Sequence, residues 1–199
     1  NSSYIDVTPG GKDSGYMNVN ATRTGYYLAK FMNTVADFLK PLEEQDSRHY
    51  NPMLRKAEVW LNFAEASNEA FGPKVVGPGC TKSAYDVIKI IREKSGGITD
   101  VTYLDEMAAS KETFRTLIQN ERRIEFAFEN QRFWDLRRWL LPLNEPIYGM
   151  RVTRDGSGDD VFEVVKVEDR PLNDVRYYYM PLPYLEVQKN PNLINNKGW

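Results

Sequence analysis

Residues 120–139 have the sequence NERRIEFAFENQRFWDLRRW, the densest pattern of charged and aromatic side chains in the chain. Apolar residues at helical spacing run into this stretch and predict a helix, which Ser110 begins as its N-cap. Asn130 marks a break, because asparagine tolerates the left-handed conformation that ends helices. A second short helix is expected over residues 133–141. The apolar stripe of the first helix consists of Phe114, Leu117, Ile118, Ile124 and Phe128.

The helical period also appears earlier in the chain. A stripe that begins after Met53 predicts a helix of about five turns, which Gly72 and Pro73 end. Ser83 is the expected N-cap of another helix, which residues 96–97, both glycine, end. Two successive pairs of antiparallel helices are typical of tetratricopeptide-like repeats. The stripes consist of Leu54, Ala57, Leu61 and Ala64 in the first helix and of Ala84, Val87, Ile88 and Ile91 in the second.

The fold class expected from these patterns is mostly α, with a small β-hairpin and long irregular segments. Residues 1–51 are expected to form loop and one strand, the latter over Thr24–Phe31. Helical hairpins are expected over 52–97 and 110–142. Residues 146–199 are expected to form strands and a C-terminal coil. The strands of that last region comprise residues 148–152, residues 161–167 and an extended run at 176–180.

Composition excludes several classes of function. The 199 residues are 41% hydrophobic and 27% charged, with a net charge of −2, which is not the charge of a nucleic-acid-binding protein. No apolar run approaches the ~20 residues of a membrane-spanning helix. The single cysteine, Cys80, excludes an internal disulfide, and the single histidine, His49, argues against a catalytic triad or a two-histidine metal site. We therefore expect no cofactor and no metal.

The charged stretch allows two interpretations. Glu121 and Glu125 lie one helical turn apart and invite the hypothesis of a glycoside hydrolase that uses a carboxylate pair. The other hypothesis is a structural ion-pair network in which arginine forks hold partly buried carboxylates. Such a network would have a structural role and would not catalyse hydrolysis. Its predicted members are Glu121, Arg122, Glu125, Arg132, Asp135 and Arg138.

Aromatic residues are the other side chains that could bind a ligand, and the chain contains 12 Tyr, 9 Phe and 4 Trp. The apolar face of a sugar ring stacks on an aromatic face, while the hydroxyls at its rim hydrogen-bond to polar groups. Trp60, Phe63 and Trp139 lie at helical positions and are expected in the core. Tyr16 lies in a Gly- and Asn-rich loop and is the candidate for carbohydrate contact.

Three segments together strongly resemble the C-terminal part of the SusD/RagB family of nutrient-binding outer-membrane lipoproteins. The first is residues 55–66, RKAEVWLNFAEA, and the second is the charged stretch. The third is the chain end, with Met180–Pro183, Asn190–Pro191 and Gly198–Trp199. Their order also matches, and the resemblance covers residues 24–199.

The resemblance implies that residues 1–199 are the C-terminal portion of a SusD/RagB-like domain with a tetratricopeptide-like scaffold. It implies no enzymatic activity, but binding of an oligosaccharide or polysaccharide for delivery to a SusC-like TonB-dependent transporter. The expected location is the surface of the outer membrane in Bacteroidetes, through a lipid anchor on an N-terminal remainder of the same protein. A glycoside hydrolase and a peptide-binding helical-repeat scaffold remain the alternatives.

Overall fold

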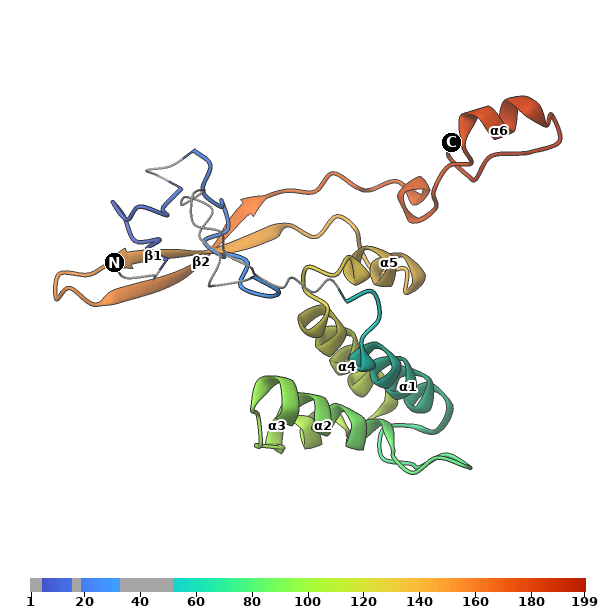
Figure 1. Cartoon of the computed structure of the whole chain (residues 1–199), viewed down its shortest axis with the longest axis horizontal. Helices are drawn as coiled ribbons and strands as arrows, with labels where there is room; N and C mark the ends of the chain where they lie inside the picture. The colour runs from blue at the N-terminus through green and yellow to red at the C-terminus, as the bar shows by residue number, and fades with distance from the viewer. Residues whose placement is uncertain (1–4, 16–18, 33–51) are drawn as a thin grey trace, which may run out of the picture. The chain divides into compact units, whose positions relative to one another are not determined.

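The computed structural model describes residues 5–15, 19–32 and 52–199, and these divide into two compact units (Figure 1). The helical unit contains the described residues 52–135, and the hairpin unit contains 5–15, 19–32 and 136–199. The helices of the first are α1 (Lys56–Phe71), α2 (Ala84–Gly96), α3 (Thr102–Met107) and α4 (Lys111–Glu125). Helix α5 (Gln131–Arg138) runs from one unit into the other. The hairpin unit adds β1 (Ile147–Arg154), β2 (Asp160–Glu168), the 3₁₀ helix η1 (Val175–Tyr178) and α6 (Tyr184–Lys189).

The core of the helical unit forms where α1 contacts both α2 and α4. Apolar residues three or four positions apart in each helix face this core, which is the packing that the sequence stripes predict. Trp60 and Phe63 pack against the core from partly buried positions. The fully or almost fully buried apolar side chains are Leu61, Ala64, Ala84, Val87, Ile88, Ile91, Leu104, Phe114, Leu117, Ile118 and Phe126.

Local sequence explains where α2 and α4 begin and where α1 ends. Ser83 and Ser110 each accept a hydrogen bond from a backbone N–H in the first turn and form capping boxes with Asp86 and Thr113. Gly72 ends α1 with φ +89°, a conformation that favours glycine. The predicted helices are therefore confirmed, as is the mostly α fold class with a small hairpin. The short helix predicted over 133–141 instead spans Gln131–Arg138, since Leu140 has φ +54°, which a helix cannot contain. The assignment of helical hairpins to 52–97 and 110–142 stays a prediction.

Strands β1 and β2 form a two-stranded antiparallel sheet, in which Val152 lies opposite Phe162 and Met150 opposite Val164. Asp155 closes the connecting turn, because its side chain accepts hydrogen bonds from the backbone N–H of Ser157 and Asp159. The predicted hairpin and its turn are confirmed.

The strand predicted over Thr24–Phe31 is wrong, since residues 24–31 are irregular. Gly25 and Phe31 have φ values of +75° and +61°, which a strand cannot contain. Instead, the backbone approaches the hairpin at one point, where Met150 N donates to Thr24 O at 2.8 Å.

Two predictions near the end of the chain are also wrong. The run 176–180 is not extended, because Asp174 caps the 3₁₀ helix η1 by accepting a hydrogen bond from Arg176 N. The expected coil contains α6, which starts after Pro183, a residue that favours the first turn of a helix. Ile124 and Phe128, which were expected in the buried stripe of α4, are largely exposed. Phe128 lies beyond the end of α4 at Glu125 and has φ +64°, so it does not continue the stripe.

Candidate functional site

The two carboxylates of the hydrolase hypothesis are each held by an arginine from another element. Glu121 lies on α4, and its Oε1 accepts from Arg92 of α2 at 2.5 Å. Glu125 Oε1 accepts from Arg55, the residue before α1, at 2.7 Å. Each carboxylate thus joins two segments that are far apart in sequence.

Arg55 holds the end of α4 in place. It donates to both carboxylate oxygens of Glu129, at 2.7 and 2.8 Å, and to the backbone O of Glu125 at 2.9 Å. The hydrogen bond to Glu129 is the main cause that raises the pKa of Arg55 above its usual value. Its guanidinium also lies 5.5 Å from the ring centroid of the buried Phe126, which Arg122 approaches to 5.1 Å.

A buried ion pair connects α4 and α5. Arg122 donates to the two oxygens of Asp135 at 2.9 and 3.1 Å, and also to Asn62 Oδ1 of α1 at 2.7 Å. Both charged side chains are at most 4% exposed. A planar guanidinium matches a carboxylate at two points, so this pair joins Asp135 firmly to α4.

Of the six residues predicted for the network, the structure therefore brings Arg122 and Asp135 into direct contact. Arg132 and Arg138 lie on α5, and the Arg138 guanidinium is 4.2 Å from the ring centroid of Trp139. Trp139 is partly exposed and lies outside the core cluster. Tyr16, the predicted carbohydrate contact, lies outside the described residues.

Sequence reasoning missed the partners Arg55, Arg92 and Asn62. Each lies 29 residues or more from the residue that it binds on α4, so no helical periodicity relates the two. Arg55 is the first residue of the motif 55–66, and its place in that motif is the signal by which it could have been identified as a functional residue.

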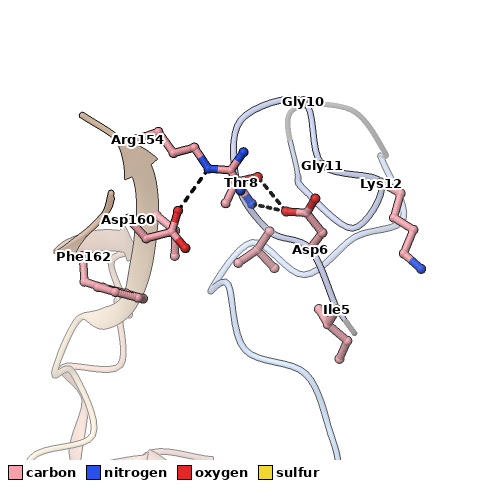
Figure 2. A pocket seen from close by; sticks show the side chains of 11 residues that line it. Ile5, Asp6, Thr8, Gly10, Gly11, Lys12, Arg154, Asp160 and Phe162 are labelled. Carbon is pink, nitrogen blue, oxygen red and sulfur yellow. Dashed lines mark hydrogen bonds and ion pairs between the residues drawn. The ribbon is translucent and has the colours of Figure 1, made fainter. Parts of the chain in front are cut away.

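A cavity of about 700 Å³ lies in the hairpin unit, between residues 5–12 and the end of the hairpin near its turn (Figure 2). The hairpin contributes Val152, Arg154, Asp160 and Phe162. The remaining lining residues are Ile5, Asp6, Val7, Thr8, Gly10, Gly11 and Lys12. None of these residues was predicted from the sequence to line a binding site.

Hydrogen bonds of Asp6 shape the loop wall of the cavity. Asp6 Oδ1 accepts from the hydroxyl of Thr8 at 2.6 Å and from its backbone N–H at 3.1 Å. These bonds, with the charge of Arg154 as a smaller cause, lower the pKa of Asp6. Gly11 is required here, since a Cβ atom would lie 2.5 Å from Asp6 O and Oδ1.

The hairpin wall combines an ion pair with an exposed ring. Arg154 Nε donates to Asp160 Oδ1 at 3.2 Å, and Phe162 is 67% exposed beside them. Figure 2 shows this pair and Phe162 on one side and the loop on the other, with the Lys12 side chain extending away from the hairpin. The cavity therefore offers charged, hydroxyl and aromatic groups together.

Residues 5–15, 19–32 and 52–199 contain no cluster of three or more His, Cys, Asp or Glu side chains that could hold a metal ion. Within the same residues, no helix has the length and apolar character needed to cross a membrane.

The fold and the sites define a mostly helical protein that is braced by arginine–carboxylate pairs and carries a small hairpin with a polar and aromatic cavity. The SusD family model matches residues 2–199, and the chain belongs to this family.

Several known proteins similar to this chain are described as SusD-like. SusD-like protein P2 of Formosa agariphila is 32% identical over 161 residues, which are 78% of this chain and 27% of that protein. SusD-like protein P25 of the same organism is 29% identical over 175 residues, or 85% of this chain and 27% of that protein. A crystal structure of a SusD-like protein from Bacteroides fragilis is 37% identical with a TM-score of 0.55, covering 74% of this chain and 25% of that one. The chain spans about a quarter of the length of these proteins.

Proposed function

We propose that this chain takes part in binding an oligosaccharide or polysaccharide at the cell surface, without breaking bonds in it. The observation that carries the proposal is the match of the SusD family model to residues 2–199, because this family generally binds nutrients and glycans. Relatives named SusD-like support the same assignment.

The geometry of the carboxylates supports binding rather than hydrolysis. A glycosidase needs two carboxyl groups that flank a sugar bond, about 5–5.5 Å or 6.5–9.5 Å apart and open to the substrate. In this chain, Arg92 and Arg55 hold Glu121 and Glu125 through charge-assisted hydrogen bonds. A substrate would have to displace a guanidinium from each carboxylate before reaching it.

The rest of the proposal concerns location and partners. Family membership supports association with the outer membrane through a lipid anchor and delivery of the glycan to a SusC-like TonB-dependent transporter. Further sequence of the same protein, N-terminal to this chain, would carry the anchor. A peptide ligand is the competing possibility for a helical-repeat scaffold.

Affinity electrophoresis tests the proposal. The 199-residue chain is run through native gels that contain amylopectin, xylan, laminarin, galactomannan or alginate, and each polysaccharide is afterwards assayed for new reducing ends. We expect retardation by at least one polysaccharide, with no new reducing ends. Migration that no polysaccharide slows, or retardation that a mixed peptide digest abolishes, would contradict the proposal.

A further inference from the structure

The cavity between residues 5–12 and the hairpin has the size of a ligand site. Its volume of about 700 Å³ lies within the 300–1,000 Å³ typical of small-molecule pockets. Hydrogen bonds within the loop hold one wall in place: Asp13 N donates to Asp6 O at 3.0 Å, and Gly11 N to Thr8 O at 2.8 Å. The other wall is held in place by the pairing of strands β1 and β2.

Asp160 is paired with Arg154, and Asp6 is the other carboxylate of the lining, while the Lys12 side chain extends away from the hairpin. A phosphate or another strong anion would face two carboxylates, and a cation would face the guanidinium of Arg154. A neutral ligand rich in hydroxyls meets neither repulsion, because hydroxyls donate to carboxylates and accept from guanidinium groups.

Phe162 supplies an apolar surface beside these polar groups. Its ring lies on the same face of the sheet as Val152, its partner in the register, and remains 67% exposed. A pyranose has an apolar C–H face and a polar rim, so it can stack on such a ring while its hydroxyls reach the surrounding charged groups.

The geometry points to a sugar-binding site in this cavity, with Phe162 as the stacking platform and with Asp6 and the Arg154–Asp160 pair as hydrogen-bonding partners for one ring of a neutral glycan. This inference rests on the proposed function and assigns it a site within these 199 residues. Asp6 is suited to the role because Thr8 occupies Oδ1, while Oδ2 forms no hydrogen bond to the described residues.

The test compares Phe162→Ala with two control variants in the same five polysaccharide gels. Val164→Ala alters the next residue on the same face of β2, which is 66% exposed but does not line the cavity. Phe128→Ala removes an equally exposed aromatic ring from the helical unit. Dissociation constants come from migration plotted against polysaccharide concentration. Thermal melts followed by circular dichroism show whether each variant is folded.

We expect Phe162→Ala to weaken binding of a neutral polysaccharide by about tenfold, a ratio equivalent to ~1.4 kcal/mol. Both controls are expected to bind as the unmodified chain does. Equal binding by Phe162→Ala and the unmodified chain would overturn the assigned site and leave the proposed function standing. No retardation of the unmodified chain by any polysaccharide would overturn both. Retardation by alginate alone would overturn the neutral class of ligand.

Discussion

Arg122 shows how a single residue joins three helices of the chain. From α4 it binds Asp135 of α5 at two points and Asn62 of α1 at one, and its side chain is 4% exposed. Transfer of two charges from water into an apolar interior is costly, and it is offset only when both partners are present with good geometry. The pair therefore adds little net stability, although loss of either partner would be costly.

Removal of one partner tests this interpretation. We expect Asp135→Ala to lower the free energy of unfolding of the helical unit by about 3–5 kcal/mol, because the Arg122 charge would remain buried without its counter-ion. Urea denaturation followed by far-UV circular dichroism measures the change. The matched control is Arg115→Ala, which breaks a pair with Glu69 whose side chains are 40% and 39% exposed. Such a partly exposed pair is worth about 0–1 kcal/mol. Equal losses in the two variants would contradict the account.

The cap of α2 gives a prediction about pH. Hydrogen bonds from the backbone and side chain of Ser83 lower the pKa of Asp86 below its reference value of 3.8. The stability that this carboxylate contributes is therefore fully present above pH 3.8 and is lost as the pH falls through the lowered, folded-state value.

We expect Asp86→Asn to be less stable than the unmodified chain at pH 7, with a difference that shrinks between pH 5 and pH 2. Urea midpoints over this range measure the effect. Ser83→Ala, which removes the hydroxyl that Asp86 binds, is expected to reduce the same pH dependence in part. A difference that stays constant down to pH 2 would show that the carboxylate charge does not stabilise the cap.

At the scale of elements, two glycines allow the irregular segment 22–25 to lie against β1. A Cβ atom on Gly25 would lie 2.2 Å from Met150 O, and one on Gly149 would lie 2.6 Å from Thr24 O. Gly25 also has φ +75°, which other residues rarely adopt. The close approach therefore depends on the absence of a side chain at both positions.

We expect Gly149→Ala to separate this segment from β1 and to break the hydrogen bond from Met150 N to Thr24 O. Amide hydrogen exchange at Met150 should become at least about tenfold faster, since the amide would lose its partner. Gly156→Ala is the control, because a Cβ atom on that turn glycine meets no atom within 4 Å. Unchanged exchange in Gly149→Ala would mean that the contact does not need the glycine.

The elements also show which signals in the sequence were sufficient to predict a helix. Helices α1, α2 and α4 combine a 3.6-residue apolar period with serine caps or a terminal glycine, and all three were predictable. The short elements η1 and α6 have no buried stripe, and α6 has no side-chain cap, so they lack the signals that identify the long helices. The partners of Glu121 and Glu125, like the cavity, depend on contacts between segments far apart in sequence, which local periodicity cannot reveal.

At the scale of the molecule, we assign different functional roles to the helical unit and the hairpin unit. The helical unit contains the buried core and the arginine–carboxylate pairs, so we assign it the role of scaffold. The hairpin unit contains the cavity with the exposed ring of Phe162, so we assign it the role of ligand contact. Both assignments assume that the chain binds a glycan and leaves it intact.

One measurement tests that central claim most directly: prolonged incubation of the chain with the polysaccharide that retards it, with reducing ends followed over time. The account predicts retardation in the gel and a reducing-end signal that stays at the level of the polysaccharide alone. A signal that rises with time, and that Glu125→Gln abolishes in a chain that remains folded and still binds, would contradict it. That result would identify the protein as a glycoside hydrolase.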